Sequence, residues 1–275
     1  MATQNILASG GEWPNLDGRR PRIMMVTSSR IAYRGLLGRV GPRKFGAWVF
    51  YMALQEPFKI SVNGGPQCSE RIALVPPYRS HQISTQDHEI ATILVEAETV
   101  CHSEVEAFSQ FEAFISTPAR QQELMARMQK AFEQKLERPE DFDQQFFGVK
   151  LPARVLDARI RQTLIKLNSV ESDKVTLSEC AADAKLSFSR FSHLFCKETQ
   201  ATFRGLRAWK RARRLLFMVA DDPSLVNAAL DAGYADSTHF SHAIREFYGC
   251  SPRGIFAGSR QLKVICQWPS NTAAV

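Results

Sequence analysis

The tripeptide FSH occurs twice in this chain, in KLSFSRFSHLFCKE (residues 185–198) and in GYADSTHFSHAIREF (residues 233–247). The residues around the two copies also correspond, once a single extra residue is allowed in the second turn. The matched pairs are Leu177 with Leu225, Ala181 with Ala229, Asp183 with Asp231, Ala184 with Ala232, Phe191 with Phe240, Ser192 with Ser241, His193 with His242 and Phe195 with Ile244. Small residues in a first helix, a break at Lys185 or Gly233, and a second helix that begins with hydroxyl residues are typical of a helix-turn-helix. The sequence therefore predicts two helix-turn-helix units.

Residues that cap helix N-termini lie where these helices are expected to begin. Thr176 and Glu179 have the spacing of a capping box. Three further helix starts are marked by Ser224, by Asp236 or Ser237, and by Ser251 followed by Pro252.

The helical period decides which residues of the two second helices face outward. Phe191 and Phe195 are four positions apart, as are Phe240 and Ile244, so each pair is expected to face the core. The polar residues that then point outward lie on the N-terminal half of each helix, which enters the major groove in helix-turn-helix complexes. We predict that base edges are contacted by Ser189, Ser192, His193, Ser237, Thr238, Ser241 and His242. A lone histidine in such a place is more often a surface or packing residue, and its repetition after Ser at equivalent positions is what favours DNA.

Basic residues are predicted to contact the DNA backbone. The net charge of the chain is +7, and residues 199–220 hold six basic residues and no acidic one. Residues 203–220 are expected to form a connecting helix about 27 Å long. That length could bring the two reading helices to successive turns of B-DNA, which repeat about every 34 Å. The predicted phosphate contacts are Arg190, Lys197, Arg204, Arg207, Arg211 and Arg245. A solvated helix face is the alternative interpretation of the basic run.

The first hundred residues have a different texture. Short apolar or alternating runs at residues 47–54, 58–62, 71–75 and 90–96 are separated by Gly, Pro and Asn, which predicts a small antiparallel barrel or sandwich. From residue 103 the pattern becomes helical, with two helices expected at 103–116 and 118–136.

With these residues in view, the region from about residue 154 to 260 resembles the DNA-binding domain of AraC/XylS-type transcription regulators. The two stretches that carry the resemblance are TLSECAADAKLSFSRFSHLFCKETQATF and SLVNAALDAGYADSTHFSHAIREFYGCSP. The second contains the residues of the family's most characteristic signature, namely Gly233, Tyr234, Asp236, Phe240, Phe247, Gly249 and Pro252. The resemblance implies a seven-helix domain in which a long helix joins two helix-turn-helix units.

The sequence departs from that family at four positions. Lys185 and Gln200 stand where the family usually has Gly. Arg207 and Lys210 fall where relatives often have apolar residues, so the connecting helix is more basic than usual.

The N-terminal part is similar, less specifically, to the cupin-like sensor domain of the same family. The resemblance implies an all-β cupin-like barrel plus helices, followed by an all-α domain with two helix-turn-helix units. We expect a sensor or dimerisation domain at 1–138 (barrel about 23–100, helices about 103–136), a linker at 139–153, the DNA-binding domain at 154–262 and a tail at 263–275. The two helices either form a homodimer contact or pack on the barrel.

The barrel is a candidate site for an apolar or aromatic effector. The pocket residues that we predict are Trp48, Phe50, Met52, Phe58, Tyr78 and His81, and filling of the barrel core is the alternative role for them. No H-x-H is present, so we predict no metal, no cofactor and no catalytic residue. The six cysteines are scattered without C-x-x-C, which argues against a zinc site or a disulfide framework.

The sequence thus predicts a sequence-specific regulator of transcription that binds double-stranded DNA. The resemblance to the family implies an activator, and we expect RNA polymerase as a partner of it. Neither a long apolar run nor a signal peptide is seen, so a cytoplasmic protein is expected. Two alternatives stay open: a regulator controlled by a protein partner without a ligand, and a cupin-type metalloenzyme fused to a DNA-binding module.

Overall fold

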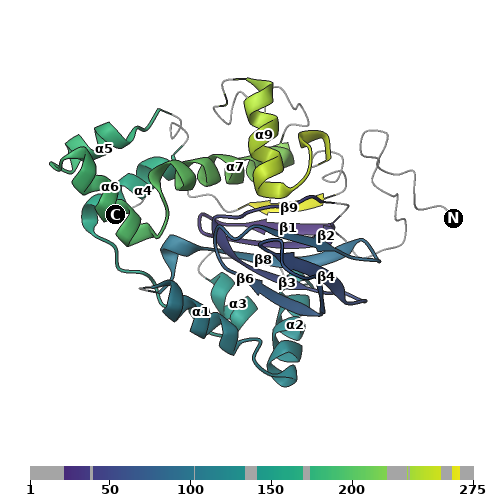
Figure 1. Cartoon of the computed structure of the whole chain (residues 1–275). Coiled ribbons are helices and arrows are strands. Elements are labelled where there is room, and N and C mark those ends of the chain that lie inside the picture. Colours follow the sequence, from purple (N-terminus) through teal and green to yellow (C-terminus); the bar gives the residue numbers. More distant parts are fainter. Residues whose placement is uncertain are drawn as a thin grey trace.

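The computed structural model describes residues 22–37, 40–101, 103–133, 141–169, 174–221, 234, 236–254 and 262–266 (Figure 1). Two sheets and three helices form the N-terminal domain, and helices form most of the C-terminal domain. The predicted fold class is confirmed. None of the described helices is both long and apolar enough to cross a membrane.

The N-terminal domain is built on a six-stranded sheet and a three-stranded sheet. The larger has the order β6-β3-β8-β2-β1-β9, and the smaller has the order β5-β4-β7. The strands of the N-terminal domain are β1 (Arg22–Val26), β2 (Arg30–Leu36), β3 (Ala47–Met52), β4 (Phe58–Val62), β5 (Cys68–Glu70), β6 (Ile72–Val75), β7 (His81–Ser84) and β8 (Glu89–Glu96). Every residue of β3 and β8 is buried, because both faces of these central strands are covered. The four predicted strand segments are thereby confirmed as β3, β4, β6 and β8.

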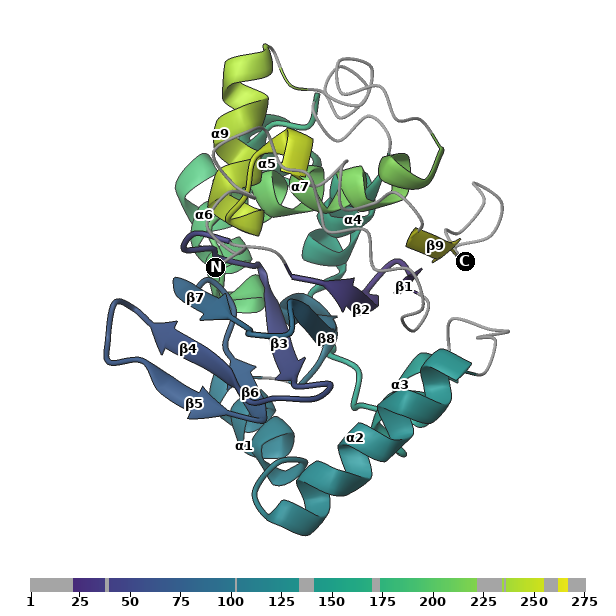
Figure 2. The ribbon, with the colours of Figure 1, turned by 90° about the vertical axis from the view of Figure 1, so that its right-hand side faces the viewer.

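Three helices cover one face of the large sheet (Figure 2). They are α1 (Glu104–Ala113), α2 (Pro118–Glu133) and α3 (Phe142–Phe147), and a short 3-10 turn, η1 (Ala97–Thr99), precedes them. Phe111 of α1 packs its ring 5.3 Å from both Trp48 and Phe50 of β3. Ala107 shares the buried side of α1, whereas Phe108 is 39% exposed. The helices therefore use their apolar faces against the sheet.

The predicted linker at residues 139–153 differs from what is observed. It contains α3, whose Phe142 and Phe146 are fully buried in the same core cluster as Trp48. The side chain of Asp143 also forms an ion pair with Arg30 of β2 at 2.8 Å. Residues 142–147 are thus part of the N-terminal domain, and a short polar stretch alone did not mark a boundary.

The C-terminal domain begins with α4 (Ala158–Asn168) and the first helix-turn-helix unit, α5 (Leu177–Asp183) and α6 (Phe188–Thr199). The long α7 (Phe203–Asp221) leads to α9 (Ser237–Tyr248). The predicted capping box of Thr176 and Glu179 is present in full. The side chain of Asp236 caps α9 by accepting from the backbone N–H of His239 at 2.7 Å, so Asp236 rather than Ser237 is the N-cap. Predictions for Ser224, Leu225, Ala229, Asp231, Ala232 and Gly233 lie outside the described residues.

One strand follows the C-terminal domain. In β9 (Leu262–Cys266), each residue pairs in parallel with β1, in the register Arg22 to Leu262. Residues 263–266, predicted as part of a tail, thus join the N-terminal sheet, as Figure 2 shows. The chain thus returns to β1 after α9.

Lys185 and Gln200 take the left-handed backbone conformation that glycine adopts without strain. Their φ angles are +54° and +57°. Lys185 follows α5, where the backbone N–H of Leu186 donates to the carbonyl oxygen of Ala181 at 3.0 Å, and Gln200 ends α6. The two departures from the family's glycines are therefore accommodated by local strain, and the turns keep their geometry.

Lys185→Gly is expected to stabilise the protein by about 0.5–1 kcal/mol. Removal of Cβ relieves the left-handed conformation, and the greater freedom of glycine in the unfolded chain offsets part of that gain. Thermal or urea unfolding measures the change. Lys197→Gly, in the helical part of α6, is the matched control and should destabilise by about 1 kcal/mol. Equal destabilisation by both variants would contradict the strain at residue 185.

Candidate DNA-binding surface and ligand cavity

The helix α6, which is predicted to contact base edges, has one buried side and one exposed side. Phe191 and Phe195 are fully buried, as their spacing predicts. The predicted base-contact residues Ser189 and His193 are exposed, and Ser192 is half-buried. Their exposed side also carries two of the predicted phosphate contacts, Arg190 and Lys197.

The helix α9, for which the same role is predicted, repeats this arrangement. Phe240 and Ile244 are buried. Ser237, Thr238 and His242 are exposed, Ser241 is half-buried, and Arg245 is exposed one residue beyond Ile244. The inward and outward phases predicted from the repeat are confirmed in both helices. Contact of these side chains with DNA stays a prediction.

Two exposed residues at the helix starts are not among the predicted DNA contacts. Phe188, the first residue of α6, is 57% exposed although it lies three positions before the buried Phe191. Such spacing is a signal for the core, so no pattern in the sequence would have placed this ring in solvent. His239 of α9 is exposed as well, and its ring lies 5.8 Å from that of Tyr234.

The basic run on α7 faces largely inward, which corrects the expectation that it follows the DNA backbone. Lys210, Arg213 and Arg214 are 5%, 2% and 8% exposed. Of the predicted phosphate contacts on this helix, Arg204 is exposed, whereas Arg207 and Arg211 are half-buried. Arg207 donates to the carbonyl oxygen of Val175 at 2.7 Å, and the guanidinium of Arg211 lies 5.2 Å from the ring centre of Tyr234.

The buried cations of α7 meet two carboxylates at the end of β8 and in η1. The Lys210 ammonium lies 2.6 Å from a carboxylate oxygen of Glu96 and also contacts Glu98, and Arg213 lies 2.9 Å from the other oxygen of Glu96. The Trp209 indole N–H donates to Glu96 at 3.1 Å. All four charged side chains are at most 3% exposed. This interdomain charge cluster, formed by Glu96, Glu98, Lys210 and Arg213, joins the barrel to the connecting helix.

The charged groups in the cluster shift one another's pKa values. Burial acts to raise the pKa of Glu96, but attraction by Lys210 and Arg213 outweighs it and holds the pKa below its ordinary value. The pKa of Glu98 is raised by burial and, against attraction by Lys210, by repulsion from Glu96. Burial acts to lower the pKa of Lys210, yet both carboxylates raise it. Glu96 is therefore the firmly ionised anion of the cluster.

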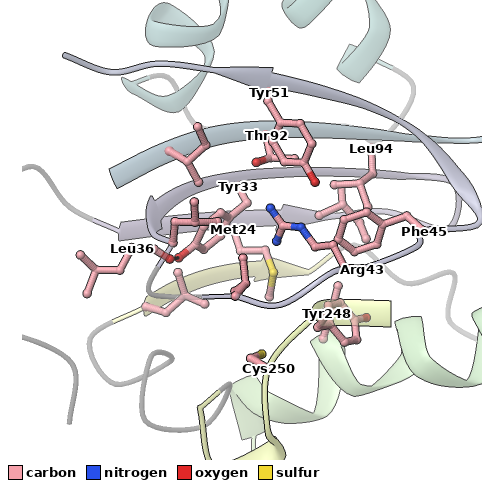
Figure 3. Close-up of a pocket in the computed structure, with 16 residues that line it drawn as sticks. Met24, Tyr33, Leu36, Arg43, Phe45, Tyr51, Thr92, Leu94, Tyr248 and Cys250 are labelled. Atoms are coloured by element: carbon pink, nitrogen blue, oxygen red, sulfur yellow. Dashed lines mark hydrogen bonds between the residues drawn. The ribbon is translucent and has the colours of Figure 1, made fainter. Parts of the chain in front are cut away.

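A cavity of about 160 Å³ lies between the sheet and the C-terminal domain (Figure 3). It is mostly apolar, and its walls come from both domains. The barrel contributes Met24, Ile31, Tyr33, Leu36, Leu37, Val40, Arg43, Phe45, Tyr51, Ile90, Thr92 and Leu94. The C-terminal part contributes Leu216 of α7, Tyr248 and Cys250 at the end of α9, and Leu262 of β9.

None of the six residues predicted to form an effector pocket lines this cavity. Trp48, Phe50 and Met52 point to the other face of the sheet and pack under the helices there. Phe58 and Tyr78 pack on the cavity side of the sheet without lining the cavity, and His81 packs there against Phe45 and Tyr51. His81 instead supports the cavity wall, because its Nε2 lies 2.7 Å from the hydroxyl of Tyr51. Among the described residues, no group of three or more His, Cys, Asp or Glu could hold a metal ion.

Comparisons with known proteins agree with this architecture. A protein-family profile described as a helix-turn-helix domain matches residues 180–257. The HTH-type transcriptional regulator ExsA of Pseudomonas aeruginosa is 33% identical over 69 residues, which are 24% of this chain and 23% of that protein. The transcriptional activator NphR of a Rhodococcus species is 34% identical over 95 residues, which are 33% of this chain and 27% of that protein. The chain thus spans about a quarter of the length of these relatives.

Solved structures extend the likeness to both domains. ToxT of Vibrio cholerae, in a 1.65 Å crystal structure, has a TM-score of 0.50 and 11% identity, over 83% of this chain and 98% of that chain. A crystal structure of an apo lysine-to-alanine variant of ToxT has a TM-score of 0.51 and 10% identity, over 84% of this chain and 97% of that chain. At this identity the likeness concerns the fold alone.

Proposed function

We propose that this chain, whose C-terminal domain is an AraC-type helix-turn-helix domain, regulates transcription by reading two successive major-groove segments of double-stranded DNA. The observation that carries the proposal is the repetition in α6 and α9. Each helix buries an aromatic or aliphatic pair and exposes a histidine with hydroxyl residues at equivalent positions. Such side chains hydrogen-bond to base edges in the major groove. Activation is proposed as well, because one relative is described as a transcriptional activator.

The N-terminal domain is proposed to sense a small-molecule effector in the cavity. An occupant would contact the barrel together with Leu216, Tyr248 and Cys250, which belong to the DNA-binding domain. Binding there can therefore favour one placement of α9 relative to the barrel. RNA polymerase as a partner, a homodimer and a cytoplasmic location accompany the proposal, and no reaction is assigned to the barrel.

Footprinting on DNA selected from a randomised library tests the DNA-binding proposal. Two protected segments about one helical turn apart are expected, with affinity that falls steeply as salt rises. A single protected segment, or binding indifferent to ionic strength, would overturn it. A rise in melting temperature with a bound small molecule would separate an effector-controlled regulator from one controlled by a protein partner alone.

The salt dependence of DNA affinity should distinguish an exposed arginine from one that is hydrogen-bonded within the protein. Arg245→Ala is expected to reduce the slope of log affinity against log salt by about 0.9, because one phosphate contact is lost. Arg207→Ala is the matched control and should leave the slope unchanged, since its guanidinium is held by the Val175 carbonyl. Binding isotherms between about 50 and 200 mM salt provide the measurement. An equal reduction of the slope in both variants would show that Arg207 also contacts a phosphate.

A further inference from the structure

Arg43 places a buried positive charge in the wall of the cavity. The residue is 7% exposed, and its Nε and Nη2 have no hydrogen-bond partner among the described residues. Within the described part of the chain no carboxylate forms an ion pair with it. Its guanidinium carbon instead lies 5.4 Å from the ring centre of Phe45 and 5.1 Å from that of Tyr51. Figure 3 shows the guanidinium directed into the space between Tyr33, Tyr51 and Phe45.

The other titratable side chains among the lining residues are neutral at physiological pH. Burial raises the pKa of Tyr51 to about 12 and that of Cys250 to about 11, and it raises that of Tyr33 further. Behind the wall, burial and then repulsion by Arg43 lower the pKa of His81 to about 4. Arginine keeps its charge under all these conditions. Among the described residues that line the cavity, the guanidinium is therefore the single charge.

An uncompensated buried charge is costly, so buried charges in proteins are normally paired. The planar guanidinium fork matches a carboxylate, which can accept two parallel hydrogen bonds. The volume sets the size of the part of an occupant that the walls can enclose, because an apolar cavity of about 150 Å³ holds a molecule the size of benzene. The observed space of about 160 Å³ therefore fits a compact apolar body.

We propose that the cavity binds a compact amphiphilic carboxylate, with its anionic group on Arg43 and its apolar body against Met24, Ile31 and Leu94. The inference deepens the proposed effector site and rests on the proposed function only for its regulatory meaning. Binding itself can be measured without DNA.

The position of Arg43 links such a ligand to the second reading helix. The segment that carries it pairs with the barrel through mutual backbone hydrogen bonds of Arg43 and His81, both at 2.9 Å. The same segment meets the end of α9. There the backbone N–H of Gly41 donates to the carbonyl oxygen of Gly249 at 2.6 Å, and the backbone N–H of Lys44 donates to the carbonyl oxygen of Glu246 at 3.0 Å. A carboxylate on Arg43 thus sits beside the backbone connection between the barrel and α9.

Titration calorimetry of the full chain with 3-phenylpropanoate and hexanoate, against 3-phenylpropan-1-ol and hexan-1-ol, tests the proposal. The carboxylates are expected to bind more tightly than the alcohols of the same skeleton. Arg43→Met should weaken carboxylate binding roughly 10- to 100-fold and leave alcohol binding unchanged, because only the charged hydrogen bonds are lost. It should also raise the melting temperature of the ligand-free protein, since an unpaired buried charge is removed. Lys59→Met, which removes an exposed charge on β4, is the control. It should change neither the affinity for the carboxylates nor the melting temperature.

Three results would overturn the proposal: alcohols that bind as tightly as carboxylates, no carboxylate binding at concentrations up to about 5 mM, or carboxylate binding that survives in Arg43→Met. Arg43→Gln gives the same comparison if the methionine variant does not fold. DNA binding is measured separately without ligand. Carboxylate binding without DNA binding would refute the proposed function and support this inference. DNA binding without carboxylate binding would support the proposed function and refute this inference.

Discussion

Glu96→Ala is expected to lower the free energy of unfolding by about 3–5 kcal/mol, because it leaves two buried cations without their shared anion. Lys210 would keep only the contact with Glu98, and Arg213 would lose its carboxylate partner. The Trp209 indole N–H would lose its acceptor as well. Urea unfolding followed by tryptophan fluorescence measures the loss. A change below about 1 kcal/mol would show that the cluster does not hold the two domains together.

The matched control is a second ion pair that also joins the barrel to the C-terminal domain but is open to solvent. Lys44 and Glu246 approach to 2.8 Å, with side chains 37% and 54% exposed. Glu246→Ala is expected to cost less than about 1 kcal/mol, since exposed pairs are screened and gain little. A double-mutant cycle of Glu96→Ala with Lys210→Met should show strong non-additivity, because the two side chains contact each other directly within one buried charge cluster.

The stability loss caused by Glu96→Ala is expected to depend on pH. The folded-state pKa of Glu96 lies below its ordinary value, so its stabilising contribution is present above that ordinary value and is lost as pH falls through the folded pKa. The pKa of Lys210 is raised, and the stability that follows from it is lost only as pH rises past that raised value. The difference between wild type and Glu96→Ala is therefore expected to be largest at neutral pH and to shrink in acid.

The local part of this architecture could be predicted from the sequence. The period of Phe191 and Phe195 fixes which side of α6 is buried, and the same holds for Phe240 and Ile244 in α9. The capping box at Thr176 likewise depends on residues three positions apart. These features arise from short-range chemistry, which a single sequence displays.

Two features that the sequence did not predict depend on distant partners. The basic run of α7 looks solvent-facing until Glu96, 114 positions before Lys210, is brought against it. The strand β9 is a short apolar segment that pairs with β1, at the other end of the chain. No local pattern encodes either pairing.

The prediction of which residues line the cavity was wrong for a related reason. Along β3 the side chains alternate, so Trp48 and Phe50 face α1–α3 while Val49 and Tyr51 face the other side. Both sets are apolar and fully buried, and the sequence does not say which face the helices cover. Arg43 lies outside any predicted strand, and only its burial beside Phe45 and Tyr51 sets it apart.

The double variant His193→Ala/His242→Ala is expected to have the largest effect on DNA recognition. Each good base contact contributes about 1–3 kcal/mol of discrimination against the wrong base. The two histidines lie on separate helices, α6 and α9, so their effects should add to about 2–6 kcal/mol. Selection from a randomised-site library should show that each single variant loses preference at one position and that the double variant loses it at two. Those positions should be separated by about one helical turn of DNA.

Stability and affinity must be separated in this experiment. Both histidines are exposed, so the free energy of unfolding should change by no more than about 0.5 kcal/mol. Lys59→Ala on β4 removes an exposed charge far along the chain from both helices and should leave the preferred sequence intact. A uniform loss of affinity for all sequences would assign the histidines to the phosphate backbone, and the two equivalent helices would then hold the DNA without reading it. Loss of preference at two separated positions is what a duplicated reading unit requires, because each copy can specify only the groove segment that it enters.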